Sequence, residues 1–357
     1  MNARRAASDS TEFPWEWRLS DLKAPEEGAP KVFSTFACGG GSSMGYKLAG
    51  FEVVGNCEID PRIAAVYDRN LHPKRSYVMD IRDFNRLEDL PDELYDLDVL
   101  DGSPPCSTFS MAGSREKAWG VEKRFAEGQK VQRLDDLFFA YLDTVEKLRP
   151  RCFIAENVTG LIAGNARGYV TEIVERSREL GYSVQIFKLN AAFMGVPQRR
   201  ERVFFLANRM GWGKLGMDFN EKPIVFGDVR TDEGGPALSE QVAELVRMAR
   251  KGEGGLGNSR RNAGMKPSWY NFTYCWDDRP APTITAGCKS IRMCDRTHLS
   301  DGDIVNVSTF PQDYDFSGAD VRFICGMSVP PVMMAHIASE VRRQWLGNMP
   351  ESEQEAV

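Results

Sequence analysis

Short apolar runs alternate with amphipathic segments along residues 31–207. The apolar runs predict buried strands at 31–36, 52–58, 77–79, 97–100, 152–155, 182–189 and 202–207. Between them, apolar positions that recur every three to four residues predict helices at 42–50, 60–71, 134–148 and 171–180. Strands that alternate with helices are typical of an α/β protein with a doubly wound, mostly parallel sheet.

The alternation ends near residue 208. Residues 209–278 are rich in glycine and contain one amphipathic segment, 238–251, so we interpret them as a smaller inserted domain. Helical periodicity returns at 329–346. The predicted organisation is an N-terminal arm (1–30), a large domain (31–208 and 301–348), an inserted domain with its hinge (209–300) and an acidic tail (349–357).

The composition is that of an ordinary soluble protein. Hydrophobic residues make up 42% of the 357 positions and charged residues 27%, which excludes a collagen-like, a wholly disordered or a disulfide-stabilised small protein. No run reaches the roughly 20 apolar residues of a membrane helix, and the polar N-terminus lacks the apolar segment of a secretory signal. We therefore expect a cytoplasmic protein with no membrane partner and with reduced cysteines.

Four potential metal ligands lie close together in the sequence, namely Cys275, Cys288, Cys294 and His298. Their spacing matches none of the common zinc patterns. A free cysteine often serves as a small buried apolar residue instead. We therefore predict no metal site.

The net charge of −6 argues at first against a nucleic-acid partner, but the distribution of charge is more informative than the total. Residues 115–133 hold six basic and three acidic side chains, and residues 247–266 hold six basic and one acidic. Two interpretations stay open at this point. The stretches are either solvated loops or surfaces that contact phosphates.

A glycine turn, Gly39-Gly40-Gly41, joins the first predicted strand to the first helix. Such a turn lets a nucleoside cofactor approach the backbone, and Glu58 at the end of the second strand can bind ribose hydroxyls. The third glycine of a dinucleotide fingerprint, Gly45, comes one place too late, which disfavours a nicotinamide oxidoreductase. S-adenosylmethionine has no pyrophosphate and fits better. Asp80 can accept a hydrogen bond from adenine or cap the next helix, and both interpretations stay open.

Three further segments carry candidate chemistry at predicted strand ends. Cys106 follows two prolines after the strand at 97–100, which suits a nucleophile, although an inert buried thiol is an open alternative. Glu156 ends the next strand, where it could protonate a heteroaromatic ring that Cys106 attacks. Because alternate strand residues share a face, Gln198, Arg200 and Arg202 should point together, either into a binding pocket or into a structural ion-pair ladder.

The order and spacing of these segments resemble the cytosine-5 DNA methyltransferases. The resemblance covers about residues 31–346 and implies a Rossmann-like S-adenosylmethionine-dependent methyltransferase fold with an inserted target-recognition domain. It rests on the glycine turn, Pro104-Pro105-Cys106, Glu156-Asn157-Val158, Gln198-x-Arg200-x-Arg202, Arg279-Pro-Ala-Pro-Thr-Ile-Thr285 and Gly326-x-Ser328-Val329-Pro330-Pro331.

The resemblance implies methyl transfer from S-adenosylmethionine, with S-adenosylhomocysteine as product, to a cytosine flipped out of double-stranded DNA. Cys106 would attack carbon 6 of the base, and Glu156 would hold ring nitrogen 3 and the amino group. Arg202 would contact the base oxygen, with Arg200 supporting the pocket. Carbon 5 would then take the methyl group, and loss of the ring proton and of Cys106 would restore aromaticity.

The resemblance also assigns binding positions. The implied cofactor residues are Phe36, Gly39, Gly40, Gly41, Glu58, Asp80, Ile81, Pro104, Leu137, Ser328 and Val329. The expected DNA contacts are Ser110, Gln198, Asn258, Arg260 and Arg261, and the loop after Ser110 corresponds to the family's mobile catalytic loop. The chain departs from the family pattern at Cys38, Ser107 and Met327, which stand where glycine, glutamine and asparagine are usual.

Three other functions stay open on the sequence alone: a catalytically silent binding module on the same fold, an RNA methyltransferase with the same chemistry, and the disfavoured oxidoreductase. The recognition sequence is not encoded in any recognisable pattern. The sequence also leaves open whether a cognate restriction endonuclease accompanies the protein. We expect a monomer on DNA, located in the cytoplasm or nucleoid of a bacterium or a phage-infected cell.

Overall fold

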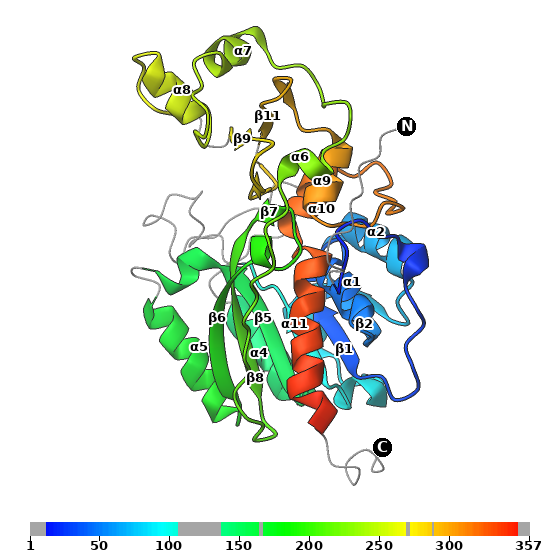
Figure 1. The fold of residues 1–357 in the computed structure, drawn as a ribbon. Coiled ribbons are helices and arrows are strands. Elements are labelled where there is room, and N and C mark those ends of the chain that lie inside the picture. The colour runs from blue at the N-terminus through cyan, green and yellow to red at the C-terminus, as the bar shows by residue number, and fades with distance from the viewer. Residues whose placement is uncertain (1–11, 106–136, 164–166, 269–271, 288, 349–357) are drawn as a thin grey trace.

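The computed structural model describes residues 12–105, 137–163, 167–268, 272–287 and 289–348. Their centre is a seven-stranded sheet in the order β3-β2-β1-β4-β5-β8-β6 (Figure 1). Strands β1 to β5 pair in parallel, whereas β8 runs antiparallel to both of its neighbours. The predicted mostly parallel sheet is therefore confirmed. The strands are β1 Lys31–Thr35, β2 Glu52–Glu58, β3 Ser76–Val78, β4 Val99–Gly102, β5 Cys152–Val158, β6 Ser183–Asn190 and β8 Glu201–Asn208.

Helices cover both faces of the sheet, and each face has its own apolar core. On one face lie α1 (Gly41–Leu48), α2 (Pro61–Leu71) and α11 (Pro331–Gln344). On the other lie α3 (Ile81–Arg86), α4 (Leu137–Leu148) and α5 (Arg167–Glu179). Single-turn helices add η1 Leu19–Asp21, η2 Asp92–Tyr95, η4 Thr159–Ile162, η6 Ala191–Phe193 and η7 Leu346–Asn348.

The strand expected to begin at Gln198 is divided. Gln198–Arg199 forms β7, which pairs with β10 (Ala281–Pro282) outside the main sheet, and β8 begins only at Glu201. The expectation of one continuous strand from Gln198 is therefore wrong. The expected alternation is nevertheless present, because Gln198 and Arg200 are buried whereas Arg199 and Glu201 are exposed, and Gln198 and Arg200 bind the N–H and the carbonyl oxygen of the same residue, Ile284.

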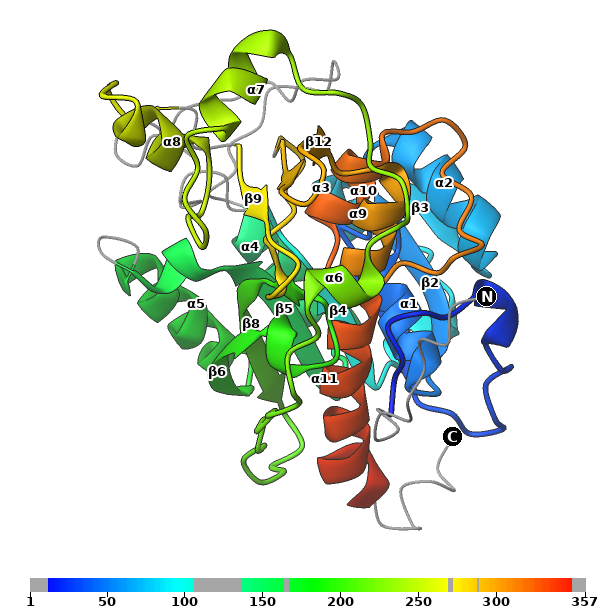
Figure 2. The ribbon, with the colours of Figure 1, turned by 45° about the horizontal axis from the view of Figure 1, so that its top comes forward.

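Residues between β8 and α9 (Asp301–Val307) build a smaller lobe beyond the sheet edge at which the parallel strands end (Figures 1 and 2). The helix predicted at 238–251 is shorter than expected, and a second helix follows it. The lobe contains α6 Phe226–Val229, α7 Glu240–Val246, α8 Leu256–Asn262 and the strands β9 Tyr274–Cys275, β11 Ile291–Arg292 and β12 Thr297–His298. It has its own small apolar cluster.

A buried ion pair joins this lobe to the large domain. Arg292 of β11 is fully buried and lies 3.2 Å from the carboxylate of Asp303 in α9. The same guanidinium donates to the backbone carbonyls of Thr231 and Glu233. The chain therefore enters and leaves the lobe through one hydrogen-bonded junction.

The N-terminal arm packs onto the large domain from residue 12 onward. Phe13 lies edge-on to the ring of His336 in α11, and Trp17 donates its indole N–H to the carbonyl of Thr309 at 2.8 Å. The segment Val321–Gln344, which contains α10 (Val321–Met327) and α11, is long and apolar enough to cross a membrane. It is mostly buried within the protein, as expected for a core element.

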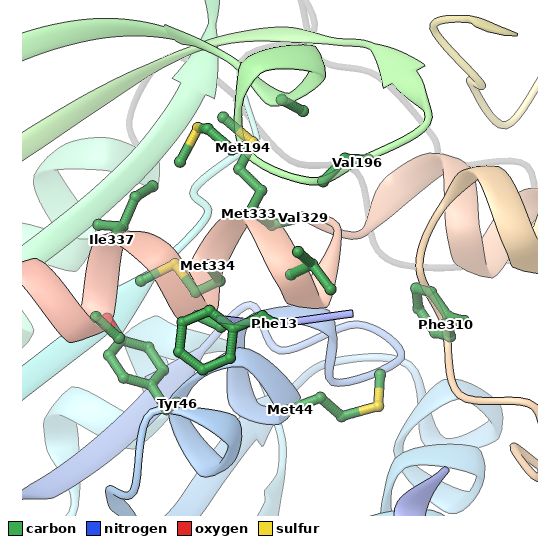
Figure 3. Packing of buried hydrophobic residues seen from close by; sticks show 14 of the residues in the cluster. Phe13, Met44, Tyr46, Met194, Val196, Phe310, Val329, Met333, Met334 and Ile337 are labelled. Carbon is green, nitrogen blue, oxygen red and sulfur yellow. The ribbon is translucent and has the colours of Figure 1, made fainter. Parts of the chain in front are cut away.

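Helices α1 and α11 approach closely, and a glycine makes this contact possible. Figure 3 shows Met333, Met334 and Ile337 of α11 in the same apolar cluster as Tyr46 of α1. A Cβ atom on Gly45 would lie 2.5 Å from Cβ of Met334 and 2.6 Å from the carbonyl oxygen of Pro331. Glycine at this position therefore sets the distance between the two helices, and α1 carries the glycine turn at its start.

We expect Gly45→Ala to lower the free energy of unfolding by about 1–3 kcal/mol, because overpacking forces the helices apart. Gly168→Ala in α5 is the matched control, since a methyl group there meets no described atom within 4 Å. That change should stabilise by about 0.5–1 kcal/mol through helix propensity. Urea unfolding followed by circular dichroism measures both, and equal stability of the two variants would contradict the packing argument.

Candidate active site

The glycine turn between β1 and α1 is held in an unusual conformation. Phe36, Cys38 and Gly40 all have positive φ angles, of 52°, 45° and 80°. Glu58 fixes the turn, because its carboxylate accepts the N–H of Cys38 at 2.8 Å and that of Asp60 at 3.0 Å. Strain at non-glycine residues of this kind concentrates at ligand-binding sites. Burial, with help from Glu58, raises the pKa of the Cys38 thiol to about 12, so this cysteine is an unreactive group in the turn.

The segment after α10 closes the site from the other side. Gly41 packs so closely on this segment that a Cβ atom there would overlap the carbonyl oxygen of Val329 and approach Cβ of Ser328 to 2.9 Å. The turn and this segment line a small cavity together with Phe36. The buried Ser328 hydroxyl has no hydrogen-bond partner of ordinary geometry among the described residues. An unpaired buried hydroxyl at such a cavity is suited to bind a polar group of a ligand.

The remaining predicted cofactor residues lie at neighbouring strand ends. Asp80 caps α3 by accepting the N–H of Arg82 at 2.8 Å, so the capping interpretation is confirmed. Ile81 and Leu137 are buried at the first turns of α3 and α4. Pro104, after β4, offers its carbonyl oxygen to the side chain of Asn157 at 3.1 Å.

Two charged residues at the ends of β5 and β8 form the main polar contact of the site. Nε of Arg202 lies 2.8 Å from Oε1 of Glu156, and both side chains are only 12–13% exposed. The antiparallel register places Arg202 opposite Val158, so the pair is a diagonal cross-strand contact on one face of the sheet. The pair reaches the edge where β4 also ends.

Arg200 lies in the chain between β7 and β8 and is buried. Its guanidinium donates to the carbonyl oxygens of Ile284 at 2.8 Å, Gly326 at 3.1 Å and Ser328 at 2.9 Å. Burial first, and then the nearby charge of Arg202, lower the pKa of Arg200 to about 9, so it remains charged at neutral pH. Arg200 therefore fixes the backbone around the site rather than facing a substrate.

Comparison with known proteins identifies the architecture. The sequence profile described as C-5 cytosine-specific DNA methylase matches residues 30–343. The chain belongs to this family. Among its relatives, Type II methyltransferase M.AplI of Arthrospira platensis is 33% identical over 348 residues, which cover 92% of this chain and 90% of the relative. Type II methyltransferase M.NgoPII of Neisseria gonorrhoeae is 36% identical over 180 residues, and that match spans about half of each protein, 50% and 48%.

Solved structures agree with the family assignment at the level of the fold. A putative DNA modification methyltransferase encoded within an E. coli prophage superposes with a TM-score of 0.65, at 18% identity. The superposition covers 88% of this chain and 99% of that protein. The methyltransferase fold expected from the sequence is therefore confirmed.

The described structure of this methylase family member does not include the predicted nucleophile. Cys106, Ser107 and Ser110 lie outside the described residues, as does the basic stretch 115–133. The chain up to Pro105 is described. Asn157, which follows Glu156 in β5, donates its side-chain amide to the carbonyl oxygen of Pro104. The approach to Cys106 is thereby fixed beside the Glu156–Arg202 pair.

The predicted DNA contacts are placed unequally. Gln198 is 1% exposed, donates to the carbonyl of Val307 and accepts the N–H of Ile284, so it serves as an internal brace. This burial argues against the predicted contact of Gln198 with DNA. Arg261 is exposed on α8, whereas Arg260 donates to the carbonyl of Lys266 and Asn258 is half-buried.

The sequence analysis did not assign a role to three residues of the site. Asn157 was visible only as part of a motif. Tyr314 donates its hydroxyl to the carbonyl of Gly39 at 2.7 Å and so supports the glycine turn. Asp101 lines the same small cavity from β4. An aspartate directly after the apolar pair Val99-Leu100 is the signal that could have singled out Asp101.

The cysteine cluster of the smaller lobe contributes no recognisable centre. Cys275 is buried, Cys294 is exposed and Cys288 lies outside the described residues. Within the described part of the chain, no group of three or more potential ligands is arranged to hold a metal ion.

We expect Arg200→Ala to lower the free energy of unfolding by at least about 3 kcal/mol, because it leaves three buried carbonyl oxygens without a donor. Arg199→Ala, at the exposed neighbouring position, should stay within about 0.5 kcal/mol of the parent. Urea unfolding measures both. An Arg200→Ala protein as stable as the parent would show that solvent replaces the guanidinium, against the burial seen here.

Proposed function

We propose that the protein transfers a methyl group to carbon 5 of cytosine in double-stranded DNA. The observation that carries this proposal is the half-buried pair of Glu156 and Arg202 beside the chain that leads to Cys106. A carboxylate acceptor and a guanidinium donor that lie side by side are suited to bind the donor and acceptor atoms along one edge of a base. Family membership supports the same chemistry.

The donor in this proposal is S-adenosylmethionine, which supplies an electrophilic methyl group. The residues fit such a ligand in two respects. Gly39 and Gly41 leave no room for a side chain where the turn meets the 324–329 segment, and the buried Ser328 hydroxyl interacts only with the Cys38 thiol among the described residues, with no hydrogen bond of ordinary geometry. The turn, Glu58 and Ser328 would hold the nucleoside and the amino acid parts.

In the reaction that we infer, the Cys106 thiolate forms a bond to carbon 6 of the ring, and the electron pair of the 5,6 double bond moves toward carbon 5. Glu156 holds nitrogen 3 and the amino group, and Arg202 holds the base oxygen, so that developing charge is stabilised. Carbon 5 takes the methyl group as the bond between that group and the sulfonium breaks, which leaves S-adenosylhomocysteine, and carbon 5 then loses its proton to a base. Cleavage of the bond to sulfur restores the aromatic ring.

The target base must leave the duplex to reach these groups. The exposed cations of α8 and its flanks, Arg261 among them, would supply phosphate contacts, with the salt dependence that such contacts bring. The relatives named Type II methyltransferases support a partner restriction endonuclease as a further part of this proposal. We propose that one copy of the chain acts on each site.

Cys106→Ala should abolish methyl transfer to duplex DNA and leave S-adenosylhomocysteine binding unchanged, because the thiol acts only on the base. The measurement uses labelled S-adenosylmethionine, a mixed-sequence duplex and bisulfite sequencing, which also reports the recognition sequence. Cys294→Ser, at an exposed thiol outside the site, is the control and should remain active. Methylation by Cys106→Ala would refute the mechanism, and labelling of transfer RNA in place of DNA would redirect the substrate to RNA.

Glu156→Gln should lower the rate of methyl transfer by about 10²–10⁴-fold, the range typical for loss of a proton-handling group. Cofactor binding should stay unchanged, since Glu156 faces the base in this proposal. Glu201→Gln is the matched control, because Glu201 lies on the same strand as Arg202 but pairs with exposed Lys188 at 2.9 Å. Single-turnover rates compare the two variants, and equal losses would remove Glu156 from the base pocket.

A further inference from the structure

Asp101 is a carboxylate in the middle of the sheet. It belongs to β4, between β1 and β5, and is 3% exposed. The two preceding residues, Val99 and Leu100, are fully buried apolar side chains. A charge in such a place is costly unless it has a partner of opposite charge. Its position in the core therefore calls for an explanation beyond folding.

The protein itself gives Asp101 only neutral hydrogen-bond donors. The Ser34 hydroxyl donates to Oδ2 at 2.8 Å, the Tyr46 hydroxyl donates to Oδ1 at 3.3 Å, and the Ser42 hydroxyl adds a third bond. Among the described residues, no lysine, arginine or histidine forms an ion pair with it. Three hydroxyls orient the carboxylate but leave its charge uncompensated.

Asp101 also belongs to the lining of the small cavity of the proposed cofactor site. Asp101 lines this cavity together with Phe36, Gly41, Ser328 and Val329, four of the positions that the sequence assigned to the cofactor. Ser42 and Ser103 complete its polar wall. An uncompensated carboxylate at a ligand cavity attracts a cation.

We propose that Asp101 binds the α-ammonium group of the methionine part of S-adenosylmethionine, and that this cation supplies the missing partner of the buried carboxylate. The inference rests on the proposed function, since it names a contact within the same site. Asp101 is then a residue that selects ligands with a free amino group.

The titration of Asp101 agrees with this role. Burial is the main cause that raises the pKa of Asp101 to about 7, and the charge of Glu156 on β5 adds to the effect. The other titratable groups that interact with it are the phenols of Tyr46, Tyr67 and Tyr141 from α1, α2 and α4, which stay neutral. Asp101 is therefore partly protonated in the free protein at neutral pH.

A bound cation favours the ionised carboxylate, so ligand binding should release a proton from Asp101. With a pKa of about 7, we expect release of about half a proton per ligand at pH 7 and about a tenth at pH 8. Affinity should fall as the pH drops below 7.

Isothermal titration calorimetry on the whole protein tests the contact with two ligands. S-adenosylhomocysteine carries the α-ammonium, whereas 5′-methylthioadenosine keeps the nucleoside and the sulfur but lacks the amino acid. Asp101→Asn should weaken S-adenosylhomocysteine by about 10- to 100-fold at pH 8, as for loss of a charged hydrogen bond. It should leave 5′-methylthioadenosine unchanged. Titrations in buffers of different ionisation enthalpy measure the proton release, which the variant should lose.

Asp98→Asn is the matched control. Asp98 is another buried carboxylate just before β4, but it binds the N–H of Lys31 and pairs with Arg151, away from the cavity. This variant should bind both ligands as the parent does. A general loss of folding would lower the affinity for both ligands, in contrast to the selective loss expected from Asp101→Asn.

Several results would overturn the assignment. Equal weakening of both ligands by Asp101→Asn, or no proton release by the unmodified protein at pH 7, would make Asp101 a structural residue. The second measurement needs no variant and so holds even if Asp101→Asn does not fold. A third titration with S-adenosylmethionine completes the test, because weakening of this ligand without weakening of S-adenosylhomocysteine would move the contact to the sulfonium. Failure of the unmodified protein to bind either ligand would instead refute the proposed function.

Discussion

The arrangement of the whole site depends on one buried guanidinium. Arg200 binds carbonyl oxygens of Ile284, Gly326 and Ser328, and these residues belong to two segments that are more than eighty positions away in the chain. The first segment follows β10 and lies between two strands of the smaller lobe, β9 and β11, and the second closes the cofactor cavity. Because a planar guanidinium offers donors in a fixed geometry, the strand that carries Arg202 is set relative to both.

This constraint explains why the sheet can end in charged residues. Glu156 and Arg202 are only about one-eighth exposed, and such a pair gives little net stability once desolvation is counted. The pair serves to place two side chains at the site. Hydrogen bonds from Arg200 and Asn157 join the ends of β8 and β5 to neighbouring backbone. The backbone that leads to Cys106 is held by the same asparagine. The site therefore contributes little to the free energy of folding. Packing elsewhere in the domain, such as that of α1 on α11, stabilises the fold that holds it.

The sequence predicted local features well and long-range partners poorly. Alternating runs gave the strands and helices of the sheet, and strand ends gave Glu156 and Arg202, because side-chain period and edge position are properties of a short segment. The partners of Gln198 could not be predicted in this way. They are Val307 and Ile284, which pairing of β7 with β10 and the fold of the chain bring from more than eighty residues away. The role of Asp80 could not be decided from the sequence either. An aspartate at that position can both cap a helix and bind a ligand.

Asp101 is a buried residue that the pattern of apolar positions did not predict. The apolar pattern predicts a strand that ends at Leu100, before the second of two aspartates, yet β4 continues through Asp101 to Gly102. The carboxylate is accommodated because Ser34 and Tyr46 from two other elements donate to it, and because burial allows it to keep its proton. A neutral acid is tolerated in the core at low cost, whereas the ionised form needs a cation. A residue that is structural in the free protein can therefore become part of the binding site when a positively charged ligand arrives, and the cost of burying its charge is then met by the ligand rather than by the fold.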